Sequence, residues 1–284
     1  MHHPAGLPEN LRRLNRTLVV GVLNATPDSF SDGGQFSASS DAVAYGLELA
    51  SSGADIVDVG GESTRPGASR ISVDEELTRV IPIISALAAE GVCVSVDTMR
   101  ASVAREALLV GAGIVNDVSG GRADPDMFKV LTESEVPYIL MHWRGHSDQM
   151  MSQSLYADLI AEVKHEISEQ ILAATTSGIA AERIVVDPGI GFSKLPEQNW
   201  QLLAQLRELT QLNHPILVGA SRKRFIGELL AKNGNDRPVS EREAGTTAIT
   251  TYLAQNKIWA VRVHDAQASA DAVSVVEKLG AFNG

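Results

Sequence analysis

The chain has 284 residues, of which 44% are hydrophobic and 21% charged, and its formal net charge at pH 7 is -11. This acidity argues against nonspecific binding to nucleic acid, which requires a basic surface. No apolar run approaches the ~20 residues that a membrane-spanning helix needs, and the first residues lack the apolar core of a signal peptide. We therefore expect a protein with neither a nucleic-acid nor a membrane partner.

Residues 1–16 form a polar lead-in, in which we expect Arg12, Arg13 and Arg16 to be solvated. The single cysteine, Cys93, has no partner for an intrachain disulfide and stands in the apolar run VCVSV, so we expect a small buried residue. One unpaired cysteine is compatible with a reducing compartment, and we expect a cytoplasmic location.

Short apolar runs alternate along the chain with longer stretches of helical spacing. Most of these runs are continuously apolar, as is typical of strands buried on both faces of a parallel sheet. The predicted strands are residues 18–23, 56–59, 92–96, 114–115, 138–141, 184–186, 216–218 and 258–263.

Helical spacing follows these runs, most clearly through residues 155–172. Asp41 is a candidate cap for a helix after the first strand, and Pro196 is a candidate first residue of another helix. We expect the last helix to begin at Ser269 or a neighbour.

Eight strands, each followed by a helix, indicate an α/β fold, a single (β/α)8 TIM barrel with a parallel eight-stranded core. Such barrels run to roughly 250 residues as one domain, and no Pro-, Gly- or Ser-rich linker divides the chain, so we assign residues 1–284 to one domain. A doubly wound open sheet is the alternative, weakened because no GxGxxG follows the first strand.

Polar residues follow nearly every predicted strand, at the end where barrel enzymes of this class place their active sites. They are Asn24, the segment 60–69, Asp97, Asn116, Met141 and His142, Asp187, Ser221 and Lys223, and Arg262 and His264.

Three of these side chains, Asp97, Asn116 and Asp187, offer planar donors and acceptors. Such groups suit a heterocycle with an amino-pyrimidinone edge, which presents adjacent N–H donors and a ring acceptor. Buried carboxylates need partners of this kind, because an unpaired buried charge is costly.

A second group comes from the last and first strands, which are neighbours in a closed barrel. Arg262 offers a bidentate fork for an anion and His264 a further donor. Asn24 offers one neutral oxygen, suitable as a single ligand for Mg²⁺ that keeps its other positions for water and phosphate oxygens. The sequence contains no His/Cys cluster with zinc spacing.

The loops after the first two strands are rich in Gly, Ser and Pro, and we expect them to close over a bound substrate and exclude water. Phe30 supports this, because an apolar ring at an exposed loop tip requires a docking partner. Asp32, Thr64, Arg65 and Pro66 lie in the same two loops.

Seven ordered motifs, NATPDSFSDGG, GGESTRPGA, SVDT, NDVSGG, DPGIGF, GASRKRF and VRVHD, resemble those of the dihydropteroate synthase family from about Val20 to Asp265. The resemblance implies a homodimeric (β/α)8 barrel. It further implies condensation of 6-hydroxymethyl-7,8-dihydropterin diphosphate with p-aminobenzoate to give 7,8-dihydropteroate and diphosphate in folate synthesis, and inhibition by sulfonamides.

The family's site residues carry over to matching positions here. The resemblance implies a pterin site of Asp97, Asn116, Met141, Asp187 and Lys223. It implies a diphosphate site of Asn24, Arg65, Arg262 and His264, with Mg²⁺ at Asn24. It implies a p-aminobenzoate site of Phe30, Thr64, Pro66, Phe192, Ser221 and Lys223.

Two departures from the family pattern are visible. Ala25 replaces the usual Val, which should affect packing and not chemistry. Trp143 and Arg144 replace the commoner Met-Gln after Met-His, a change expected to alter the rim of the pterin pocket.

The chemistry favours a dissociative, SN1-like path, because an arylamine is a weak nucleophile. Arg262, His264 and the metal ion would neutralise charge on the departing diphosphate. Asp97 and Asp32 would stabilise the cation left on the pterin, and Lys223 completes the set of candidate catalytic residues.

Two alternatives remain open. A corrinoid-type pterin-dependent methyltransferase domain uses a similar barrel and pterin pocket but needs no diphosphate site. A non-catalytic pterin-binding paralogue should have lost anion-site residues, whereas Asn24, Lys223, Arg262 and His264 are all present.

Overall fold

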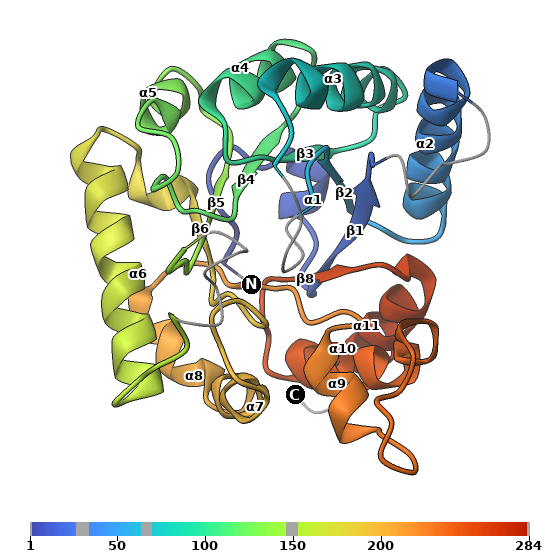
Figure 1. The fold of residues 1–284 in the computed structure, drawn as a ribbon, viewed down its shortest axis with the longest axis vertical. Coiled ribbons are helices and arrows are strands. Elements are labelled where there is room, and N and C mark those ends of the chain that lie inside the picture. The colour runs from blue at the N-terminus through green and yellow to red at the C-terminus, as the bar shows by residue number, and fades with distance from the viewer. Residues whose placement is uncertain (1, 27–33, 64–69, 146–152, 283–284) are drawn as a thin grey trace.

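Parallel strands form the centre of the protein, and helices surround them (Figure 1). The computed structural model describes residues 2–26, 34–63, 70–145 and 153–282. The strands are β1 (Leu18–Asn24), β2 (Ile56–Gly60), β3 (Val94–Asp97), β4 (Ile114–Asp117), β5 (Tyr138–Met141), β6 (Ile184–Asp187), β7 (Leu217–Val218) and β8 (Ala260–Val263).

The sheet closes on itself. Its strand order is β6-β5-β4-β3-β2-β1-β8-β7, and every pairing is parallel. A parallel bridge between Val186 and Ile216 joins β6 to the start of β7, and Val186 N donates to Pro215 O at 2.9 Å. The predicted (β/α)8 barrel is therefore confirmed.

At least one helix follows each strand in turn around the ring, and one short helix precedes the first strand (Figure 1). They are α1 (Glu9–Arg12), α2 (Gly34–Ser51), α3 (Val73–Ala89), α4 (Ala101–Leu109), α5 (Met127–Thr132), α6 (Leu159–Thr176), α7 (Pro196–Ala204), α8 (Leu206–Leu209), α9 (Arg224–Leu229), α10 (Glu243–Gln255) and α11 (Ala266–Gly280), with 3-10 helices η3 (Ala181–Arg183), η4 (Thr210–Leu212) and η5 (Val239–Glu241). Among the described residues, none of these helices has both the length and the apolar character needed to cross a bilayer.

All eight predicted strands are present, and β1, β2, β3, β4 and β6 end later than predicted. Asn24, Asp97, Asp117 and Asp187 are the last residues of β1, β3, β4 and β6, beyond the apolar runs. Ladder hydrogen bonds join backbone groups whatever the side chain, so an apolar pattern alone places the strand end too early.

The predicted helix starts need larger corrections. Asp41 lies inside α2 and does not cap it. The carboxylates of Asp158 and Asp265 instead cap α6 and α11, each accepting a bond from the backbone N–H three residues later. The last helix therefore begins before Ser269, whereas Pro196 opens α7 as predicted.

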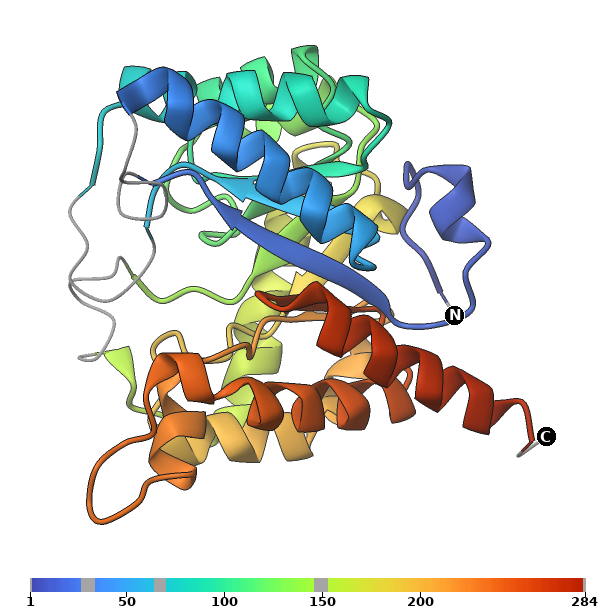
Figure 2. The ribbon, with the colours of Figure 1, turned by 90° about the vertical axis from the view of Figure 1, so that its right-hand side faces the viewer.

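The lead-in closes the end of the barrel where the strands begin (Figure 2). Leu7 and Leu11 are buried and pack against the first inward-facing side chains of the strands, including Leu18. The buried Trp259 donates from Nε1 to His3 Nδ1 at 3.1 Å, which ties the lead-in to the start of β8. The described lead-in thus contributes to the core as well as to the surface. Cys93, partly buried, packs against the same cluster, and burial raises the pKa of its thiol to about 12.

The expectation that Arg16 is solvated is wrong. Its guanidinium forms two hydrogen bonds of 2.8 Å with the carboxylate of Asp55, which also accepts a bond from Val19 N at 2.8 Å. The pair therefore fixes the chain where the lead-in enters β1.

We expect Arg16→Ala to lower the free energy of unfolding by about 1–3 kcal/mol, because it leaves the shielded carboxylate of Asp55 short of a donor. Urea denaturation measures the change. Arg13→Ala is the matched control: Arg13 pairs with Glu9 at the surface, and we expect a loss of under about 1 kcal/mol. Equal losses for the two variants would contradict the assigned role of the Arg16 pair.

Candidate active site

The predicted pterin residues lie side by side at the carboxyl ends of neighbouring strands. In the register of the sheet, Asp97 on β3 faces Asn116 on β4, and Met141 on β5 faces Asp187 on β6. Directly paired residues of parallel strands point to the same face. The barrel therefore gathers the predicted donors and acceptors at one mouth.

Arg262 on β8 occupies the centre of this arrangement. Its Nε donates to Asp58 Oδ2 at 2.5 Å, and its Nη2 donates to Asp97 Oδ2 at 2.5 Å. Asn116 Nδ2 also donates to Asp58 Oδ2, at 3.1 Å. The structure thus joins Arg262, predicted for the diphosphate, to the predicted pterin residue Asp97 directly and to Asn116 through the carboxylate of Asp58.

Sequence analysis missed Asp58. It interrupts the apolar run IVDVG of β2 and has no solvent exposure. A carboxylate inside a strand buried on both faces was the available signal, since Asp is almost never fully buried without a partner.

Burial and pairing set the charges of this cluster. Burial raises the pKa of Asp97 above its ordinary value, and the adjacent Arg262 opposes that rise. For Arg262, burial acts to lower the pKa, but Asp58 and Asp97 outweigh it and keep the guanidinium charged. The cluster therefore holds a permanent cation at the mouth.

The turn after β6, residues 188–193, is built around Asp187 and Lys223. Gly189 N donates to Asp187 Oδ1 at 2.7 Å. Lys223 Nζ donates to the backbone carbonyl of Ile190 and lies 4.5 Å from the ring centroid of Phe192. Burial raises the pKa of Asp187, which Lys223 opposes, and burial lowers the pKa of Lys223 to about 8, which Asp187 opposes. The two groups thus stabilise each other's charge.

Two glycines give this turn its shape. Gly189 and Gly191 have φ of +68° and +80°, which favours glycine. A Cβ at Gly189 would lie 2.6 Å from the carbonyl oxygen of His142, and a Cβ at Gly191 would lie 2.6 Å from Lys223 Cδ. The glycines of the motif DPGIGF thus allow the turn to form and also allow its backbone to lie close to His142 and Lys223.

His264 and Ser221 are also brought together. Ser221 Oγ and His264 Nδ1 are 2.9 Å apart, and His264 N donates to the same hydroxyl at 3.2 Å. These contacts connect the loop after β7 to the end of β8, next to the strand that carries Asn24. Asn24 itself ends β1 and is partly exposed.

Five predicted site residues lie outside the described part of the chain. These are Phe30, Asp32, Thr64, Arg65 and Pro66.

The residues that flank positions 64–69 belong to an ion-pair network that sequence analysis missed. Arg100 Nη2 donates to Glu62 Oε2 at 2.7 Å and to Ile71 O at 2.6 Å, and its Nη1 pairs with the buried Glu76. Thr98 Oγ1 donates to Glu76 Oε1 at 2.6 Å. Because Thr98 follows Asp97 in the chain, this network connects both ends of the second loop to the predicted pterin site.

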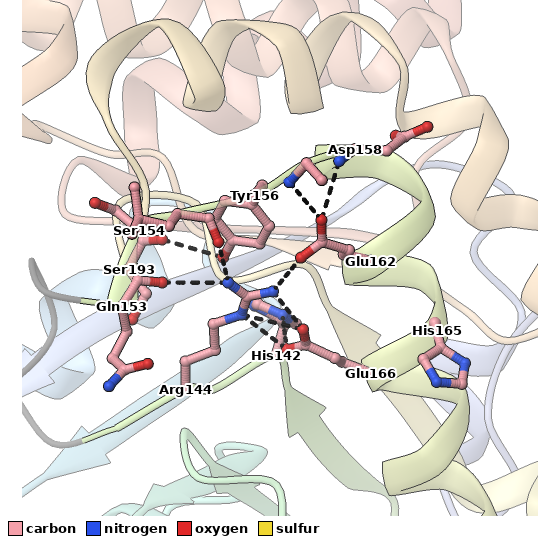
Figure 3. Close-up of polar contacts among 12 residues, drawn as sticks. His142, Arg144, Gln153, Ser154, Tyr156, Asp158, Glu162, His165, Glu166 and Ser193 are labelled. Atoms are coloured by element: carbon pink, nitrogen blue, oxygen red, sulfur yellow. Dashed lines mark hydrogen bonds and ion pairs between the residues drawn. The ribbon is translucent and has the colours of Figure 1, made fainter.

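A second ion-pair network surrounds Arg144, one of the residues that depart from the family pattern. Its guanidinium contacts Glu166 at 2.5 Å and Glu162 at 2.8 Å on α6, and lies 3.8 Å from the ring centroid of Tyr156 (Figure 3). His142 Nε2 is 2.9 Å from the same Glu166. Arg144 therefore connects the chain after β5 to α6.

Comparison with known proteins identifies the family. Residues 20–264 match the profile of the pterin binding enzyme family. The dihydropteroate synthase of Mycobacterium leprae (strain TN) is 50% identical over 260 residues, covering 91% of this chain and 92% of the relative.

Solved structures agree with this match. A dihydropteroate synthase from Xanthomonas albilineans with 4-aminobenzoic acid has 44% sequence identity and a TM-score of 0.87, covering 94% of each chain. A Yersinia pestis dihydropteroate synthase in a sulfonamide drug complex has 37% identity and a TM-score of 0.89, covering 99% of this chain and 100% of that one. Together with the residues gathered at the barrel mouth, these similarities show that the chain belongs to the dihydropteroate synthases, the transferases of the pterin-binding enzyme family that act in folate biosynthesis.

Proposed function

We propose that the barrel mouth joins 6-hydroxymethyl-7,8-dihydropterin diphosphate to p-aminobenzoate by loss of diphosphate, and that three adjoining subsites divide this work. The main observation in support of this proposal is the position of Arg262. Its guanidinium bonds both Asp58 and Asp97 at the strand ends, so a fixed cation lies beside the acceptors suited to a pterin.

The pterin subsite would consist of Asp97, Asn116, Asp187 and Lys223, with Met141 against the ring. Carboxylate and amide oxygens accept from the N–H groups of an amino-pyrimidinone edge, while the amide of Asn116 and the ammonium of Lys223 donate. Asn116 and Asp187 are buried, and the side chain of Asp97 is only 10% exposed. This supports the assignment, because a ligand would complete their hydrogen bonding away from water.

The diphosphate subsite would consist of Asn24, Arg65, Arg262 and His264. No cluster of three or more His, Cys, Asp or Glu able to hold a metal ion occurs in residues 2–26, 34–63, 70–145 and 153–282. The single oxygen of Asn24 suits a Mg²⁺ ion that arrives with the diphosphate, because Mg²⁺ commonly takes one or two protein ligands plus phosphate oxygens and water. Bound there, the ion would neutralise charge on the leaving group.

The p-aminobenzoate subsite would adjoin the turn after β6. We assign it Phe30, Thr64, Pro66, Phe192, Ser221 and Lys223. The contact between Lys223 and the ring of Phe192 supports a site where a cation lies beside an aromatic face. Sulfonamides, present in the Yersinia pestis relative, would occupy the same place.

Catalysis would rest on charge stabilisation. Arg262 and His264 stabilise the diphosphate as the bond between the pterin CH₂ and oxygen breaks. The dihydropterin ring delocalises the cation left behind, and Asp97 and Asp32 stabilise it. The arylamine then forms the new C–N bond and loses its proton. Loops closed over the site would exclude water, which would otherwise trap the cation.

We also propose that residues 1–284 form one domain and that the protein is a homodimer. Exposed apolar side chains on the late helices support an interface there, namely Leu229, Tyr252, Val275 and Leu279.

We expect the purified protein to release diphosphate from the pterin diphosphate only when p-aminobenzoate is present, and to release less when Mg²⁺ is chelated. A coupled diphosphate assay measures both effects. Bound pterin without release would instead indicate the non-catalytic paralogue, and pterin binding indifferent to the diphosphate group would indicate the methyltransferase.

We expect Arg262→Ala to lower kcat by about 10²–10³, the usual effect of removing one preorganised donor to a developing anion. Arg262→Lys is the control, since it keeps the charge but loses the fork that joins Asp58 and Asp97, and we expect a smaller loss. Single-turnover rates at saturating substrate provide the measurement. An unchanged rate for Arg262→Ala excludes the role.

We expect Asp187→Ala to abolish detectable pterin binding, a loss of about 10²-fold or more, because two charge-assisted hydrogen bonds contribute roughly 1.5–3 kcal/mol each. Asp187→Asn keeps the shape and an acceptor for Gly189 N, so we expect a partial loss. Calorimetric titration with the pterin distinguishes the variants, and near-normal affinity for Asp187→Ala refutes the assignment.

A further inference from the structure

The turn after β6 leaves its carbonyl groups in need of donors. Gly189, Gly191 and Ser193 all have positive φ, so this stretch forms no regular backbone ladder. Within it, Phe192 N donates to Gly189 O at 3.0 Å, and Gly191 N donates to Asn199 Oδ1 at 2.6 Å. Buried carbonyl groups without donors are costly, so side chains must complete the bonding.

Two lysines supply the missing donors. Lys194 Nζ donates to Gly189 O and to Phe192 O, each at 3.1 Å, and Lys223 Nζ donates to Ile190 O. Lys223 belongs to the proposed substrate site. Lys194 is buried behind the turn and has no part in the proposed chemistry.

The third contact of Lys194 is with His142, whose Nδ1 lies 3.1 Å from Nζ. Burial, with a further contribution from Lys194, lowers the pKa of His142 to about 3, so the imidazole is neutral. Glu166 can only accept at Nε2, so that nitrogen carries the imidazole proton. Nδ1 is then an acceptor, and all three N–H groups of the Lys194 ammonium are satisfied.

The network ends at the surface with Arg144. Burial raises the pKa of Glu166, but hydrogen bonds from His142 and Arg144 outweigh it and lower the value to about 2, so Glu166 is an anion. Figure 3 shows Arg144 directed at Glu162 and Glu166 on α6. Burial lowers the pKa of Lys194 to about 7, and Asp187 and Glu166 oppose that shift. The charge on Lys194 is thus supported by Asp187 and by a carboxylate that α6 and Arg144 hold in place.

We propose that Lys194 is a positioning residue for the synthase reaction. Its ammonium holds the turn after β6 in the shape that presents Asp187, Phe192 and Lys223 to the substrates. The proposal rests on the substrate sites assigned above. Without the ammonium, Phe192 O loses the donor that Lys194 supplies, and Gly189 O keeps only the bond from Phe192 N. We expect the turn then to loosen, so that Gly189 N no longer has a fixed position against Asp187.

We expect Lys194→Met to lower kcat/KM by about 10²-fold, the effect of a displacement of about 1 Å in a substrate-positioning group. Most of the change should appear as higher KM for both substrates. A merely structural role would reduce the active fraction and hence kcat, and leave KM unchanged. Lys164→Met, which removes a surface lysine bonded to Gln211, is the matched control and should retain wild-type values.

Hydrogen exchange supplies a readout that does not depend on activity. We expect Lys194→Met to increase exchange in the peptide that covers residues 188–195, with the strands of the barrel unaffected. Unchanged exchange and unchanged KM overturn the proposal. If the wild type and Lys164→Met release no diphosphate, the proposed function fails, while the exchange data still report on the turn.

Should Lys194→Met fail to fold, Glu166→Gln decides the question. It is a milder change at a partly exposed residue, and its amide still accepts one hydrogen bond. We expect a smaller rise in KM with circular dichroism unchanged. KM equal to that of the wild type in this variant overturns the proposal.

Discussion

The site depends on one constraint: charges inside a barrel of apolar strands must be paired. Arg262 satisfies it by bonding Asp58 and Asp97, carboxylates from two different strands. Burying these charges would be unfavourable if either Arg262 or its carboxylate partners were missing. Their fixed geometry means that charge is already in place before substrate arrives, which is the condition for electrostatic catalysis.

The same rule governs the backbone around the site. The turn after β6 departs from regular structure to bring Gly189 N to Asp187, and several of its carbonyl groups accept hydrogen bonds from the ammonium groups of Lys194 and Lys223. On the other side, Arg100 holds the chain on both sides of the second loop. The irregular segments to which we assign substrate contacts are thus each held by cationic side chains.

The sequence predicted the barrel because eight apolar runs, most of them continuous, alternate with helical spacing, and it predicted Asp97, Asn116 and Asp187 at one site because parallel strands end together. It did not predict Asp58, hidden within an apolar run, or the link between Lys194 and His142, which are 52 positions apart. Contacts between residues so far apart in the chain depend on how far each side chain extends into the interior. The spacing of apolar residues along the sequence does not contain that information. The predicted helix start at Asp41 is wrong because an Asp looks the same in the sequence whether it caps a helix or lies on an exposed helix face.

The region that matches the family begins later in the chain than the region that packs into the barrel, because the lead-in is part of the core. The family match begins at residue 20, yet Leu7 and Leu11 close the barrel floor and Arg16 is bonded to Asp55. A version of the protein trimmed to the matched region would expose the apolar ends of several strands to water. A segment outside the family match can therefore set the solubility of the protein on expression, even though it lies at the opposite end of the barrel from the proposed site.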